Sequence, residues 1–178
     1  MGPTYPAHTL KLYQPHFDTI LMELQMTSFD NAVFSAPGAG NLAQGFGPHL
    51  IRISAEQTGG RLGAFEVEVP AGEGPPLHIH DREDEFFRVL EGRFAFWCNG
   101  QRVELETDGM LVVPRGAVHR FQNVGDTAGR LMCIMTPGGF EGFFAAVEEE
   151  KPASPAAIDD LAARFNLRFV PALAANAA

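Results

Sequence analysis

The sequence is poor in cysteine and in basic residues, and it has no long apolar run. Its 178 residues include two cysteines, and 13 basic residues stand against 22 acidic ones, for a formal net charge of −9. Nucleic-acid binding needs the opposite balance, with a clustered basic face, so we expect no nucleic-acid partner. An acidic surface mainly favours solubility and says little about the substrate.

The two cysteines, Cys98 and Cys133, lie in apolar, strand-like segments. We interpret them as buried free thiols that act as small hydrophobic side chains, with a disulfide as the alternative. No apolar run approaches the ~20 residues of a membrane helix, so no membrane association is expected. Residues 1–6 lack the basic segment and apolar core of a signal peptide, which favours a cytoplasmic protein.

The length fits one domain, which we divide into three parts. Residues 1–48 form an N-terminal arm, residues 49–136 the core, and residues 137–178 helices and a tail that pack on the core. In the arm, the loose alternation of residues 17–26 favours a strand over a helix. The arm has apolar character without a core of its own, so we expect it to pair with or cover a second subunit in a homodimer.

From residue 49 onward, apolar and polar residues alternate with a period of two. Asn99 and Gly100 form a strong signal for a two-residue hairpin turn, because both positions favour a positive φ. Short expected strands follow one another at regular intervals: 50–54, 65–69, 77–80, 85–90, 93–98, 102–106, 110–113, 119–124 and 131–135. This pattern predicts an all-β sandwich or barrel.

Near residue 137 the apolar period changes from two to 3.6, which predicts two C-terminal helices. The first covers about residues 140–150, with four apolar residues on one face as cover for the core: Phe140, Phe143, Phe144 and Val147. The second covers residues 155–166, with Ser154 as N-cap and Pro155 in its first turn. Its expected inward residues are Ile158, Leu161, Ala162 and Phe165.

Three histidines and one glutamate have the spacing of a metal site. His78 and His80 are two apart on an expected strand, so both imidazoles point to one face. A polar turn separates them from Glu85, and a Pro-Arg-Gly turn precedes His119. Alone, each would be read as a surface residue. Together they form a mixed nitrogen and oxygen ligand set for one divalent transition metal: Fe, Mn, Ni, Co, Cu or Zn.

The spacing of these residues resembles the two motifs of the cupin superfamily. Residues 72–92 match Gly-(5)-His-x-His-(4)-Glu-(6)-Gly, and residues 114–123 match Pro-x-Gly-(2)-His-(3)-Asn. One position departs from the second motif, because Asp108 stands where the family has glycine and Gly109 follows it. A single motif pair implies a single barrel. The resemblance therefore implies an all-β fold of the cupin type, a jelly-roll barrel of double-stranded β-helix form.

Further segments resemble the single-barrel cupins that include quercetin 2,3-dioxygenases: residues 74–78, 84–92 and 136–144. This resemblance implies a metal-dependent dioxygenase that cleaves a flavonol or a similar enolic aromatic substrate with O₂. Glu85 would then be both metal ligand and catalytic base. Two alternatives stay open, namely a metal-dependent isomerase or tailoring enzyme of a sugar or polyketide, and a non-enzymatic cupin that binds a small molecule.

Alternation along the strands also suggests a substrate pocket. Phe87 and Val89 share the face of Glu85, and Phe121 shares the face of His119. We expect these three residues to form the pocket wall, although plain filling of the barrel accounts for them equally well. His8, His16 and His49 lie in irregular or loop-flanked stretches, and we assign them no function.

Overall fold

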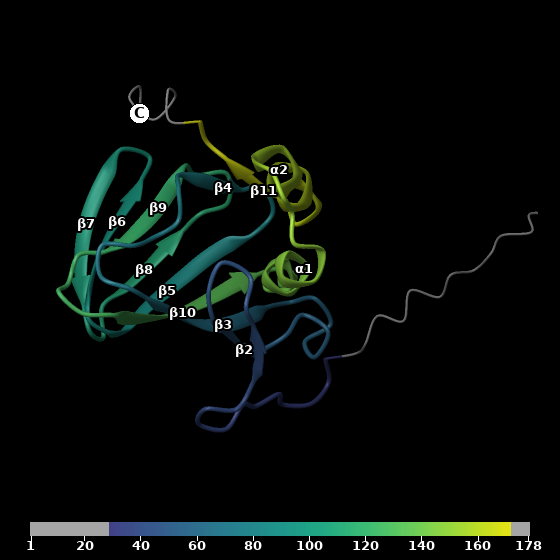
Figure 1. Cartoon of the computed structure of the whole chain (residues 1–178). Coiled ribbons are helices and arrows are strands. Elements are labelled where there is room, and N and C mark those ends of the chain that lie inside the picture. The colour runs from purple at the N-terminus through teal and green to yellow at the C-terminus, as the bar shows by residue number, and fades with distance from the viewer. Residues whose placement is uncertain (1–28, 172–178) are drawn as a thin grey trace, which may run out of the picture.

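The computed structural model describes residues 29–171, which form two antiparallel sheets and two helices (Figure 1). One sheet has the strand order β1-β2-β3-β10-β5-β8, and the other has the order β11-β4-β9-β6-β7. The strands are β1 (Asn41–Ala43), β2 (His49–Ile53), β3 (Gly63–Val69), β4 (His78–His80), β5 (Asp84–Glu91), β6 (Arg93–Cys98), β7 (Gln101–Glu106), β8 (Met110–Val113), β9 (His119–Asn123), β10 (Gly129–Thr136) and β11 (Leu167–Phe169). The predicted mostly-β fold with two short C-terminal helices is confirmed.

The period-two pattern places the core between the two sheets. In β3, Phe65, Val67 and Val69 are buried while Glu68 is exposed, as expected when successive side chains point to opposite faces. Phe87 and Val89 from β5 meet Phe94 and Phe96 from β6 in the same cluster of buried residues. The β6–β7 hairpin turns at Asn99 and Gly100, with φ of 46° and 79°, as the sequence predicts.

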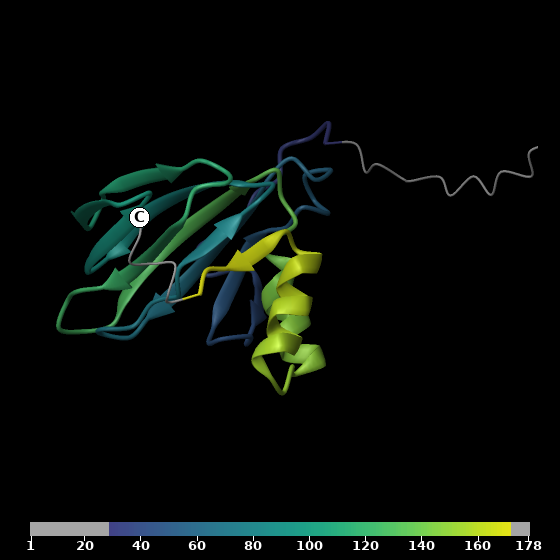
Figure 2. The ribbon, with the colours of Figure 1, turned by 90° about the horizontal axis from the view of Figure 1, so that it is seen from above.

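The two helices, α1 (Gly142–Glu150) and α2 (Pro155–Arg164), lie together at one side of the strands (Figure 2). The hydroxyl of Ser154 accepts a hydrogen bond from the backbone N–H of Ala157 at 3.2 Å, so the predicted N-cap is confirmed. α1 buries Phe143, Phe144 and Val147, and α2 buries Leu161 and Ala162. None of the helices within residues 29–171 is long and apolar enough to span a membrane. The cytoplasmic location stays a prediction.

Two short strands were not anticipated from the sequence. β1 lies in the arm and pairs with β2. β11 follows α2 and pairs with β4, with Leu167 opposite His80 and Phe169 opposite His78. Both have three residues and lie outside the regular run of expected strands, so they carry too little alternation to be recognised. The strand expected over residues 17–26 lies outside the described residues, and the role of the arm in a homodimer stays a prediction.

Candidate metal centre

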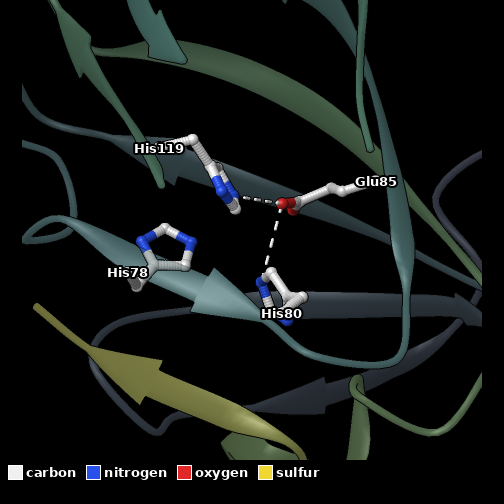
Figure 3. A group of neighbouring side chains, drawn as sticks. All are labelled: His78, His80, Glu85 and His119. Atoms are coloured by element: carbon white, nitrogen blue, oxygen red, sulfur yellow. Dashed lines mark hydrogen bonds and ion pairs between the residues drawn. The ribbon is translucent and has the colours of Figure 1, made fainter. Parts of the chain in front are cut away.

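The four predicted ligands come together between the two sheets (Figure 3). β4 supplies His78 and His80, and its neighbour β9 supplies His119, which lies opposite His78 in the register. Glu85 comes from β5 in the other sheet. All four side chains are buried, and one ligand atom from each lies within 4.8 Å of the others. The structure thus joins residues that are up to 41 positions apart in the chain into a single candidate metal site.

Backbone carbonyls orient two of the imidazoles. His78 Nδ1 lies 2.8 Å from the carbonyl oxygen of Pro76, and His119 Nδ1 lies 3.0 Å from that of Ala117. Each Nδ1–H can donate to its carbonyl, which leaves Nε2 as the ligating nitrogen. The pattern comes from the local sequence, since in both cases the acceptor is two residues before the histidine.

Glu85 connects two of the histidines. Its Oε2 lies 3.0 Å from Nε2 of His119 and 3.6 Å from Nε2 of His80. Burial lowers the pKa of His119. This effect is outweighed by the hydrogen bond to Glu85, the charge of that carboxylate and the Ala117 carbonyl, so the pKa of His119 is raised above its ordinary value. Without a metal, a proton on Nε2 therefore balances the buried carboxylate. A cation held by the same atoms would replace that proton.

A second carboxylate, that of Glu83 in the turn between β4 and β5, lies near His80. Glu83 is as buried as His80, and its Oε2 lies 3.9 Å from His80 Nδ1. Within residues 29–171 these are the only two fully buried side-chain polar atoms without a hydrogen-bond partner. Burial raises the pKa of Glu83. A metal on His80 Nε2 would make Nδ1–H a stronger donor toward Glu83, so these unpaired atoms fit a metal site.

A cavity of about 790 Å³ opens in front of the candidate metal site. His78, His80 and Glu85 line it, while His119 is not among the lining residues. Seven phenylalanines line it: Phe46, Phe65, Phe121, Phe140, Phe143, Phe144 and Phe169. Glu68, Glu73 and Asp159 also line it, and no described lysine or arginine does.

The three predicted pocket residues do not share one location. Phe121 lines the cavity. Phe87 and Val89 are almost fully buried and are not part of the lining, because they fill the barrel behind it. The Phe87 ring packs 5.7 Å from Phe121 and 5.2 Å from Phe96, measured between centroids. Other parts of the wall come from β3 and the loop after it, from the loop before β2 and from α1. The approach of these segments to the site depends on tertiary packing and is not visible in strand alternation.

Comparison with known proteins agrees with this geometry. Residues 65–135 match the family described as Cupin domain. The tetracenomycin polyketide synthase protein TcmJ of Streptomyces glaucescens is 33% identical over 108 residues, 61% of this chain and 71% of that protein. Quercetin 2,3-dioxygenase of Bacillus subtilis is 33% identical over 100 residues, 55% of this chain and 29% of that protein.

A solved structure, the cupin domain of Cnp3 from Schizosaccharomyces pombe, superimposes with a TM-score of 0.51 at 26% identity. That match covers 62% of this chain and 77% of the other. The likeness to quercetin 2,3-dioxygenase spans less than a third of that enzyme, whereas the likeness to TcmJ spans most of its length. The metal-site spacing, the two-sheet fold and these matches lead to one conclusion: the chain belongs to the cupin family.

Proposed function

We propose that this cupin is a metal-dependent dioxygenase that acts on an enolic aromatic substrate, a flavonol or a similar compound, with O₂. One observation carries the proposal: three buried imidazoles and a buried carboxylate converge at one end of an aromatic-walled cavity. His78, His80, Glu85 and His119 would hold one divalent transition metal. When bound, such an ion acidifies a coordinated hydroxyl and keeps an open position for substrate or O₂.

The charges of the cavity favour an uncharged ligand. No lysine or arginine of the described chain lines it, and Glu68, Glu73 and Asp159 add negative charge. An anionic substrate would lose its hydration without gaining a protein counter-ion, which is costly. Phosphates, uronates and small carboxylates are therefore disfavoured, and a planar aromatic compound suits the phenylalanine walls.

Glu85 is suited to receive the proton of the substrate hydroxyl. Its Oε2 already lies 3.0 Å from a histidine nitrogen, and it is buried at the cavity. A carboxylate there can accept a proton from an enol whose pKa has been lowered. In the reaction that follows, O₂ takes all its electrons from the flavonol. Both oxygen atoms enter the ring-opened product and one carbon leaves as carbon monoxide, so no further reductant is required.

A second function has support of its own. The likeness to TcmJ covers 71% of that polyketide synthase protein, more than the share covered in quercetin 2,3-dioxygenase. The same cavity would accept a polyketide, and the metal would then act as a Lewis acid without O₂. Isomerisation of a sugar is less compatible with the aromatic walls. A non-enzymatic binding cupin would leave the open metal position without a purpose.

The test is an O₂-electrode assay with metal-reconstituted protein, combined with product analysis by mass spectrometry. A flavonol and a set of polyketide-like enols are supplied to protein loaded separately with Fe, Mn, Co, Ni, Cu or Zn. The proposal predicts equal consumption of O₂ and flavonol with release of carbon monoxide. Conversion without O₂ uptake would support the tailoring function, and binding without conversion would support the binding module. The His119→Ala protein is the control.

A further inference from the structure

The cavity contains a fourth histidine, His49, which is not part of the metal centre. His49 begins β2, and its side chain is buried at 6% exposure. It lines the same cavity as His78 and His80. Its place in the chain gives no indication of function, since it follows a loop and lacks a partner histidine at strand spacing.

Three contacts fix the orientation of the His49 ring. Nδ1 lies 3.0 Å from the carbonyl oxygen of Gly47, to which Nδ1–H can donate. One face of the ring stacks on Phe144, with centroids 3.6 Å apart and planes 12° from parallel. The ring also packs 5.8 Å from Phe65. The imidazole is therefore held on three sides.

The remaining nitrogen, Nε2, has no hydrogen-bond partner among residues 29–171. The fully buried partnerless atoms of this region are His80 Nδ1 and Glu83 Oε2, so Nε2 of His49 keeps some exposed surface, and His49 lines the cavity. Burial lowers the pKa of His49, while the Gly47 carbonyl opposes the shift in part. A neutral ring with its hydrogen on Nδ1 presents Nε2 as an acceptor.

The loop before β2 holds this acceptor in place. A side chain at Gly45 would collide with the backbone carbonyl of Phe144, so glycine permits the loop to lie directly on α1. The backbone N–H of Gln44 donates to Oε2 of Glu148 in α1 at 2.8 Å. Gly47 has a φ of +102°, a conformation that favours glycine. These contacts hold the His49 side chain in position without a ligand.

A row of aromatic rings joins His49 to the metal centre. Phe140 lies 4.3 Å from His80, Phe144 lies 5.4 Å from Phe140, and His49 lies 3.6 Å from Phe144, all between centroids. A planar ligand along this row would have one end at the metal ligands and the other at His49. A molecule that reaches both ends has more than one ring.

We propose that His49 Nε2 accepts a hydrogen bond from a hydroxyl of the bound substrate, at the end of the cavity remote from the metal centre. The substrate class is accordingly an extended phenol of two or more rings. It carries an enolic oxygen at one end and a phenolic hydroxyl at the other. This inference rests on the proposed function, and it makes His49 a residue that determines specificity.

Two probes separate the ends of the cavity. 3-Hydroxyflavone has its one hydroxyl at the enolic position, whereas quercetin has additional phenolic hydroxyls on its other rings. Their Kd values are measured under anaerobic conditions, by fluorescence titration of the protein loaded with Zn²⁺. We expect quercetin to bind at least about fivefold more tightly, the factor of one hydrogen bond of about 1 kcal/mol.

Substitutions at His49 then test its part in this difference. His49→Phe keeps a ring on Phe144 but removes the acceptor, so it should abolish the preference for quercetin over 3-hydroxyflavone. His49→Gln, which retains an acceptor, should keep part of the preference. Phe169→Leu is the matched control, since Phe169 lines the cavity from β11 and its loss should weaken both probes alike. Zinc content and melting temperature show that each variant is folded and loaded.

The outcomes distinguish this inference from the function on which it rests. If both flavonols bind but the preference is absent, or is unchanged in His49→Phe, the role of His49 is wrong and the proposed function stands. If neither flavonol binds to the zinc-loaded protein, the proposed function is wrong, and the substrate class inferred from it is wrong as well. Loss of metal in His49→Phe and His49→Gln would also overturn the assignment, because His49 would then belong to the metal centre.

Discussion

Nδ1 of His80 lies 3.9 Å from Oε2 of Glu83, and the two atoms face each other in a fully buried setting. That separation is too long for a hydrogen bond. Both residues are 2% exposed, so water from the surface does not readily satisfy them. The relationship makes Glu83 the residue that would orient His80 once its other nitrogen binds a metal.

We predict that Glu83→Met lowers the affinity for metal about 10- to 100-fold, the usual effect of removing a carboxylate behind a ligating histidine. Methionine has a similar size and no charge. Competition with a chromophoric chelator measures the affinity. Asp108→Asn is the control, because Asp108 is an exposed carboxylate paired with Arg88. Equal affinity in the wild-type and Glu83→Met proteins would show that Glu83 does not support the site.

The two kinds of ligand should respond differently to substitution. His119→Ala removes one of the four ligands, and we expect lower metal occupancy and no turnover while the barrel still folds. Glu85→Gln keeps a ligating oxygen but no base, so metal is retained better while activity is lost. Metal analysis, circular dichroism and O₂ uptake test both variants. If both keep full metal and full activity, the site has been assigned to the wrong residues.

The metal-free protein should lose stability as the pH falls below about 6.5. Burial, assisted by the charge of His119, lowers the pKa of His78 to about 3, and burial with the neighbouring histidines lowers that of His80 to about 2. In the unfolded chain both histidines bind protons near pH 6.5. Below that pH the unfolded state holds more protons, so each histidine costs ~1.4 kcal/mol of stability per pH unit, down to its folded pKa.

His119 does not change this slope. Its folded pKa is raised, so its contribution is fully present below the unfolded pKa and declines only at higher pH. Urea unfolding of chelator-treated protein between pH 7.5 and pH 4.5 gives the measurement. A variant with both His78→Gln and His80→Gln should have a flatter profile. Identical profiles for the two proteins would mean that these histidines are not held neutral.

The N-terminal arm motivates a prediction about assembly. Phe34 is 85% exposed, and Leu42 on the edge strand β1 is 58% exposed. Apolar side chains along an unpaired edge favour association with another chain. We predict a homodimer by light scattering at micromolar concentration, and a shift toward monomer in a Phe34→Asp, Leu42→Asp variant. A monomeric wild-type protein would contradict the prediction.

The ligands of the metal centre could be predicted because their positions follow from strand geometry. His78 and His80 share a face through alternation alone, and Pro114 and Gly116 predict the turn before His119. His49 and Glu83 could not be found in this way. His49 reaches the cavity because a loop packs on α1. Glu83 is buried although it lies in the polar turn between β4 and β5, and nothing in the local sequence indicates that burial.

Elements of the fold with a local sequence signal could be predicted, and elements that depend on distant pairing could not. Ser154 and Pro155 predict the start of α2, and Asn99 with Gly100 predicts a hairpin turn. Each of these signals lies in the residues of the element itself. β11 has three residues, and it becomes a strand because it pairs with β4 after the chain returns through α2. Two aromatic residues of α1 have two roles. Phe143 and Phe144 are buried in the core, as predicted, and they also line the cavity.

X-ray absorption spectroscopy of the untagged protein, purified and reconstituted with a first-row divalent metal, tests the metal centre most directly. We expect about one metal per chain, with nitrogen and oxygen ligands at about 2.0–2.2 Å and the multiple-scattering signature of three imidazoles. His119→Ala should lose one imidazole. A protein that takes up no metal beyond a chelator-treated background, or whose bound metal has no histidine in its coordination sphere, would contradict the account.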